Sequence, residues 1–237
     1  MLKKIWICSL LCCLFTGCAK TNMTSAQSEA VEEADRLVNE FHFSKAWYLE
    51  DMADEMDEKE YDAKDLEWAL NYLEDEKKIQ WQEVAYQAAI EEIDSAVQSG
   101  TDFYSRKTLK DYLVDILLFT SEEADYALDK GEKKGTLEWN RYTVTAGKMH
   151  VSDFNISKAM LIQDLQDPDL YAFTKEQAEF AADYLTEKEW VDWNQEAVDY
   201  GMDGMRAYDN DKEAVEEIWF LPSGFTEEQI AYAMKYL

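Results

Sequence analysis

The sequence predicts an all-α protein, built as a tandem array of about four three-helix modules with helical hairpins. The first observation is a six-residue phrase that occurs four times, at residues 61–66, 119–124, 173–178 and 225–230. The second is a Trp that follows the Asp or Thr of the first three copies by 19 residues, at Trp81, Trp139 and Trp193. The third is the absence of any sustained period-2 pattern in a chain with only two prolines. A fixed internal spacing that returns after 52 to 58 residues indicates one supersecondary unit used repeatedly.

The repeated phrase predicts the start of a helix of about twelve residues. In each copy the Thr or Asp is followed three positions later by an acid or amide, the pattern of a capping box. The pairs are Thr120 with Glu123, Thr174 with Gln177, Thr226 with Gln229, and the shorter Asp62 with Asp65. The aromatic residue before the cap can pack on the residue five positions later, which is a hydrophobic staple.

A second helix is expected before each of the first three phrases. Ser44, Ser105 and Ser157 are predicted caps, each followed by apolar residues four and eight positions later. The 15 to 18 residues from Ser to the following Asp or Thr fit a helix of about ten residues and a short loop, and hence a helical hairpin. In the fourth unit this start is degenerate around residues 208–210.

The Trp positions predict the remaining helix of each module. Asn140 and Asn194 follow Trp139 and Trp193 and are the expected N-caps, while Trp81 begins a looser version. We therefore expect modules at residues 30–76, 81–130, 139–185 and 193–237, the first of them divergent and acidic.

The N-terminus predicts a lipoprotein signal over residues 1–17. Lys3 and Lys4 precede an apolar stretch, and Gly17 stands directly before Cys18. Such signals are removed and the new N-terminal cysteine is acylated, for example with palmitate, so residues 18–29 are expected to be the lipidated Cys18 and a tether. The alternatives are an uncleaved anchor helix and an ordinary secretory cut. The expected location is the outer face of the cell membrane, with the lipid as the only membrane contact.

The charge is strongly acidic and excludes some partners. The chain carries −28, and loss of Lys3 and Lys4 with the signal leaves −30. Residues 50–76 hold 13 acids against Lys59 and Lys64. Such a chain repels nucleic acid, so no nucleic-acid partner is expected. Two explanations stay open: a highly solvated surface, or a partner with a basic face.

No set of residues in the sequence predicts catalysis, a cofactor or a metal. His42 and His150 are the only histidines, and they form no Ser-His-Asp or metal motif. The run 199–204 hints at a calcium loop, but Asn210 stands where an EF-hand needs Glu. The cysteines other than Cys18 lie in the signal. We therefore expect no enzyme, no cofactor and no metal site.

The phrase at 173–178, together with residues 191–198 (Val-Asp-Trp-Asn-Gln-Glu-Ala-Val), resembles the repeat of the host cell surface-exposed lipoproteins. The match is good over 119–237 and weaker over 29–118. Units of that family usually have Gly before Phe-Thr, where this chain has Leu118, Ala172 and Gly224. The resemblance implies a lipid-anchored helical repeat protein of a Gram-positive bacterium. It also implies superinfection exclusion, in which entry of phage DNA is blocked by engaging the injected tail machinery.

Charge and resemblance together suggest an acidic docking surface for a basic segment of a phage tail or injected protein. The expected partner-binding residues are Glu50, Asp51, Asp54, Glu55, Asp57, Glu58 and Glu60. The alternative is a surface-anchored acidic adaptor or chaperone for basic cell-envelope proteins, unrelated to phage. An enzyme acting on the cell wall lacks the residues that its chemistry requires.

Overall fold

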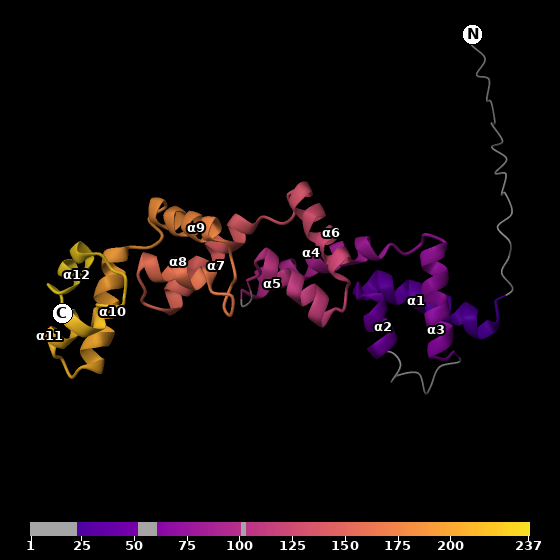
Figure 1. Cartoon of the computed structure of the whole chain (residues 1–237), viewed down its shortest axis with the longest axis horizontal. Helices are drawn as coiled ribbons and strands as arrows, with labels where there is room; N and C mark the ends of the chain where they lie inside the picture. The colour runs from indigo at the N-terminus through magenta and orange to yellow at the C-terminus, as the bar shows by residue number, and fades with distance from the viewer. Residues whose placement is uncertain (1–22, 52–60, 101–102) are drawn as a thin grey trace, which may run out of the picture.

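The computed structural model describes residues 23–51, 61–100 and 103–237. This part of the chain is helical and contains no strand, which confirms the predicted all-α fold. Its helices follow one another in four groups of three, arranged in an elongated row (Figure 1). The signal and Cys18 lie outside the described residues.

Each module consists of a long first helix, a short second helix and a third helix. Module 1 contains α1 (Ser25–Phe41), α2 (Lys45–Asp51) and α3 (Ala63–Asp75). Module 2 contains α4 (Trp81–Ser99), α5 (Arg106–Asp111) with the π-helical segment η2 (Tyr112–Ile116), and α6 (Ser121–Lys134). Module 3 contains α7 (Trp139–Asp153), α8 (Lys158–Gln166) and α9 (Lys175–Glu187). Module 4 contains α10 (Trp193–Ala207), α11 (Lys212–Ala214) with the π-helical segment η3 (Val215–Trp219), and α12 (Glu227–Ala233).

The first and third helices of every module form its largest helix–helix contact. The predicted hairpin between the second and third helices is also present, most fully between α8 and α9. Alanines allow the close approach, since Ala85, Ala89, Ala124 and Ala127 are completely buried between α4 and α6. The same use of alanine at Ala146, Ala178 and Ala181 brings α7 against α9.

All four predicted capping boxes are present. In the third module, Gln177 N donates to Thr174 Oγ1 at 3.2 Å and Thr174 N donates to Gln177 Oε1 at 2.9 Å. The boxes at Asp62, Thr120 and Thr226 have the same reciprocal bonds. A further box joins Thr24 and Gln27, so α1 begins inside the segment expected to be a tether. Ala30 and Ala34 are buried in that helix, which explains why it forms there.

The predicted caps of the first helices are wrong. Each of these helices begins at the Trp itself, and the residues before it occupy the N-cap position. Only Asp192 caps through its side chain, accepting from Asn194 N and Gln195 N. Asp192, and not Asn194, is the cap because it directly precedes the first helical residue. From that position its carboxylate can accept from the free N–H groups of the first turn.

Three equivalent loops before the third helices pass through left-handed backbone. Leu118, Ala172 and Gly224 have φ of 57°, 55° and 68°. This conformation favours glycine, and it accounts for the glycine usual at this position in the family that the sequence resembles. Gly224 is doubly constrained, because a Cβ there would lie 2.9 Å from Ala159 Cβ of module 3.

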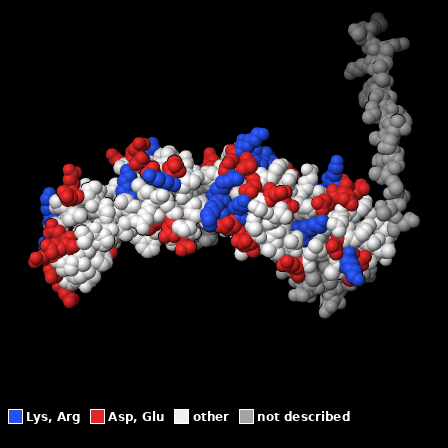
Figure 2. Space-filling view, viewed as in Figure 1, with Lys and Arg blue, Asp and Glu red and all other residues white. Residues whose placement is uncertain are grey.

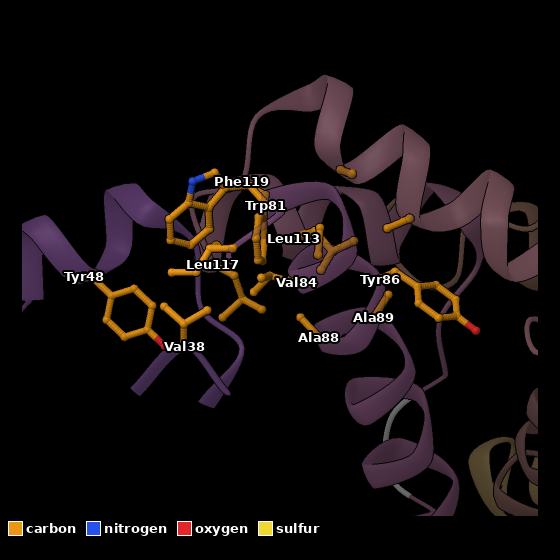
Figure 3. Packing of buried hydrophobic residues seen from close by; sticks show 14 of the residues in the cluster. Val38, Tyr48, Trp81, Val84, Tyr86, Ala88, Ala89, Leu113, Leu117 and Phe119 are labelled. Carbon is orange, nitrogen blue, oxygen red and sulfur yellow. The ribbon is translucent and has the colours of Figure 1, made fainter. Parts of the chain in front are cut away.

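The apolar core is continuous across modules 1 and 2 and divided elsewhere. One cluster of buried residues runs from Ala30 in α1 to Tyr142 at the start of module 3. Figure 3 shows how Trp81 and Val84 of α4 lie among Val38, Tyr48 and Leu117. Module 3 and module 4 have separate clusters, and Trp193 of α10 belongs to that of module 3.

The start of the second helix in module 3 takes part in the junction with module 4. Ser44, Ser105 and Ser157 are all at most 2% exposed. Ser157 Oγ donates to Ser223 O of module 4 at 2.5 Å, across 66 residues. In module 4 the degenerate start is capped by Asp211, which is exposed and, as a carboxylate, cannot donate in this way.

Candidate interaction surfaces

The predicted acidic docking residues lie mostly outside the described part of the chain. Glu50 is exposed in the last turn of α2, and Asp51 ends that helix. Asp54, Glu55, Asp57, Glu58 and Glu60 fall within 52–60, which the structure does not describe.

Acidic side chains are scattered over the face seen in Figure 2 between larger uncharged areas, and the cations are unevenly distributed. Lys and Arg gather over the middle of the row, while most of the charged side chains seen at the end formed by module 4 are acidic. Module 2 contributes Lys130, Lys133 and Lys134 from α6, and these residues line a shallow surface pocket with Tyr126 and Asp129. A chain of net charge −28 thus carries a local group of lysines at its centre.

A groove lies in module 3, between α7 and α9. It has a volume of about 720 Å³ and is lined by Glu138, Trp139, Asn140, Arg141, Val144, Thr145, Gln177, Phe180, Tyr184 and Trp190. Phe180 and Trp190 are 43% and 50% exposed, although both are large apolar side chains. The Tyr184 ring connects them, with centroids 5.9 Å from Phe180 and 5.7 Å from Trp190. The groove therefore presents a row of aromatic rings to solvent.

Polar and charged groups surround this aromatic row. Lys148 Nζ lies 4.7 Å from the centre of the Trp190 ring, and Lys188 Nζ lies 5.4 Å from that of Tyr184. Arg141 forms an ion pair with Glu138 at 3.6 Å. The side-chain amides of Asn140 and Gln177 lie at the same groove.

The equivalent positions of module 2 carry an ion pair. Lys130 takes the place that Tyr184 has in module 3, and Glu83 takes that of Arg141. Lys130 forms an ion pair with Glu83 and lies 4.6 Å from the centre of the Tyr86 ring. Hydrogen bonds from Lys130 first and then from Tyr126 lower the pKa of Glu83. The pocket on this side of module 2, of about 530 Å³, is therefore lined mainly by lysines, whereas the groove of module 3 is lined by aromatic rings.

An Asp-His-Tyr set centred on the buried His150 joins three segments of module 3. His150 Nε2 lies 2.8 Å from Asp164 Oδ2, and its Nδ1 lies 3.2 Å from the Tyr171 hydroxyl. The three residues come from α7, α8 and the loop before α9, and burial raises the pKa of Tyr171.

Two further features bear on possible ligands. Among the described residues, no group of three or more His, Cys, Asp or Glu side chains is placed to hold a metal ion. The run 199–204 is part of α10, so the hint of a calcium loop is wrong. Gly204 has a packing role there instead, since a Cβ would lie 2.5 Å from Trp219 Cδ1. None of the helices in the described part of the chain is long and apolar enough to cross a membrane.

Sequence reasoning missed the aromatic groove, although part of the signal was present. Six positions after each third-helix cap stands an aromatic residue: Trp68, Tyr126, Phe180 or Tyr232. All four residues are at least partly exposed, and Tyr126 and Phe180 are 36% and 43% exposed. Their regular recurrence outside the capping motif indicated a surface role.

Comparison with known proteins adds no relative: no protein-family model, no curated protein and no solved structure matches this chain.

Proposed function

We propose that this chain is a lipid-anchored binding protein on the outer face of the membrane that blocks the entry of phage DNA. It does so by capturing a basic segment of the tail machinery or of an injected protein. The observation that carries the proposal is the row of four similar modules with a strongly acidic surface (Figures 1 and 2). Arrays of this type present extended binding surfaces. The choice of a phage as the target rests on the resemblance of residues 119–237 to the superinfection-exclusion lipoproteins.

An acidic array suits rapid capture rather than tight pairwise contacts. Each exposed charge pair contributes about 0–1 kcal/mol, but a dense field of one sign raises the rate of encounter with an oppositely charged partner. Binding should therefore weaken as salt rises, because the Debye length falls from about 10 Å at 0.1 M to about 3 Å at 1 M.

The test is a phage assay on cells with and without the protein. Cells that carry it should adsorb phage normally but fail to take up phage DNA. Replacing Glu50, Asp51, Asp54, Glu55, Asp57 and Glu58 by Gln or Asn should reduce this protection. The matched control replaces six exposed acids of module 4, which lies far along the row: Asp209, Glu213, Glu216, Glu217, Glu227 and Glu228.

Three outcomes would contradict the proposal in different ways. Equal protection by the neutralised variant and the parent would remove the acidic surface from the mechanism. Equal loss in the module 4 control would make total charge, and not residues 50–58, the cause. Absence of protection by the parent, with binding to basic envelope proteins, would favour the adaptor or chaperone alternative.

The lipid anchor is tested separately. Cys18→Ala should abolish lipid labelling and leave the protein unprocessed or released into the medium, with loss of protection. Membrane fractionation and metabolic labelling with palmitate measure both effects. Normal labelling and retention in this variant would show that Cys18 is not the anchor.

A further inference from the structure

We propose that the groove of module 3 is a binding site for a glycan that carries N-acetyl groups, as bacterial wall polymers do. This inference is independent of the phage role. The groove lies between α7 and α9, and its volume of about 720 Å³ falls within the usual range for ligand sites, roughly 300–1,000 Å³.

The lining of the groove matches the two-sided chemistry of a sugar. A pyranose ring has an apolar face of C–H groups and an edge of hydroxyl and amide groups. The ring faces of Phe180, Tyr184 and Trp190 provide surfaces on which the C–H face can stack. Asn140, Thr145 and Gln177 supply the donors and acceptors that hydroxyl and N-acetyl groups need.

Two of the aromatic side chains of the groove, Phe180 and Trp190, keep about half of their surface in solvent. Phe180 is 43% exposed, whereas Phe173, seven residues earlier in the same module, is 3% exposed and belongs to the core. Exposed aromatic rings that are gathered in one groove are typical of a binding site, because a ligand that covers them removes apolar surface from water.

The local charge favours a neutral or anionic glycan over the basic segment proposed for the acidic surface. Arg141 and Lys148 lie at the groove or over its rings, and Glu138 is paired with Arg141. A cationic peptide would meet these two cations, while the carboxylate or phosphate groups of wall polymers would be attracted to them.

Part of the lining recurs where module 4 begins. Trp193, Asn194 and Gln229 correspond to Trp139, Asn140 and Gln177, and they line a groove of about 470 Å³ together with Thr186, Glu189, Val191 and Asp192. Tyr232 and Tyr236, at the positions of Phe180 and Tyr184, have ring centroids 5.0 Å apart but are not among the residues that line it. The stacking surface that the proposal needs is therefore that of module 3.

The first test is calorimetric titration of the soluble protein with chitotetraose, with cellotetraose as the arm that lacks N-acetyl groups. Phe180→Ala and Trp190→Ala should each weaken chitotetraose binding at least about tenfold, since each removes one stacking surface. Phe154→Ala is the matched control, because Phe154 is 56% exposed in the same module but outside the groove. All three variants should keep the circular dichroism spectrum and melting temperature of the parent to within a few degrees.

A second variant places the residues of module 2, Glu83 and Lys130, at the equivalent positions of the module 3 groove. The double substitution Arg141→Glu and Tyr184→Lys should form the Glu83–Lys130 type of ion pair in module 3 and abolish binding. The proposal is wrong if the parent binds neither oligosaccharide, if cellotetraose binds equally well, or if Phe154→Ala is as damaging as Trp190→Ala.

Sedimentation with protein-free wall glycan separates this site from the phage function. The parent should sediment with the glycan and the double variant should not, while both still protect cells from phage. If neither sediments and only the double variant loses protection, the groove binds a protein and the glycan proposal is overturned. If both protect poorly but glycan binding persists, the proposed phage function fails and the glycan site stands.

Discussion

The junction between modules 1 and 2 and the junction between modules 3 and 4 use the same structural positions but different residues. In module 2, Val84 stands three positions after Trp81, is buried, and lies in a core that module 1 shares (Figure 3). In module 4 the corresponding residue is Glu196, which is half-buried. The cores of modules 3 and 4 are separate, and hydrogen bonds join them, from Ser157 to Ser223 and from Asn155 to Asp203.

This difference indicates that the row is not uniformly rigid. A shared apolar core makes two modules unfold together, because neither can lose its packing alone. A junction made by one Trp ring, Trp193, and a few hydrogen bonds allows the last module to open with less cost to the rest. Module 4 is therefore the part of the chain in which we expect local unfolding first.

The largest expected effect comes from removing the Trp at each junction. Trp81 and Trp193 are both 7% exposed, and replacement by Ala should cost about 3–5 kcal/mol in either case. Trp81→Ala should accelerate amide exchange throughout modules 1 and 2, since its ring lies in their common core. Trp193→Ala should do so in modules 3 and 4 alone. Trp139 is less buried, so Trp139→Ala should cost less than either.

Hydrogen exchange with mass spectrometry, together with thermal melting, measures both effects. Equal acceleration over the whole chain in both variants would show that the four modules form a single cooperative unit. Unchanged melting in both would show that the Trp rings do not hold the helix starts in place.

The sequence predicted those features that depend on neighbouring residues. Capping boxes are patterns over four positions, so Thr174 with Gln177 could be recognised without knowledge of the fold. The prediction of Asn caps is wrong because both helices begin at the Trp, which places Asn140 and Asn194 inside the first turn and the preceding residue at the N-cap. The lining of the module 3 groove depends on Arg141 and Tyr184, 43 residues apart, replacing a pair equivalent to Glu83 and Lys130. A distant exchange of this kind becomes visible only once the two helices are seen side by side.

A smaller effect is expected from the loop that connects modules 3 and 4. Gly224→Ala places a Cβ against Ala159 and Ser157 of module 3 and forces a left-handed backbone, which should cost about 1–3 kcal/mol. Ala172→Gly is the matched reverse change at the corresponding position of module 3, where φ is 55°. It should leave stability unchanged or raise it by up to about 1 kcal/mol. Urea titration gives both values, and a cost at Gly224 no greater than at an exposed loop glycine would contradict the tight junction.

The smallest effect is a dependence of stability on pH that originates at Glu196. Burial first, and then the neighbouring carboxylates of Asp199 and Asp192, raise the pKa of Glu196 to about 7. The folded state therefore binds this proton more strongly than the unfolded state, in which the pKa is about 4.5. The stabilising contribution is complete below about pH 4.5 and is lost as the pH rises through about 7.

The melting temperature of Glu196→Gln should lack this dependence on pH, whereas that of Glu213→Gln, an exposed change in the same module, should retain it. Glu196→Val, which copies Val84, should in addition raise the melting temperature at pH 8 by removing a half-buried charge. A parent and a Glu196→Gln variant with the same pH profile between 4.5 and 8 would show that Glu196 ionises as freely in the folded chain as in the unfolded one, and that the two junctions differ in packing alone.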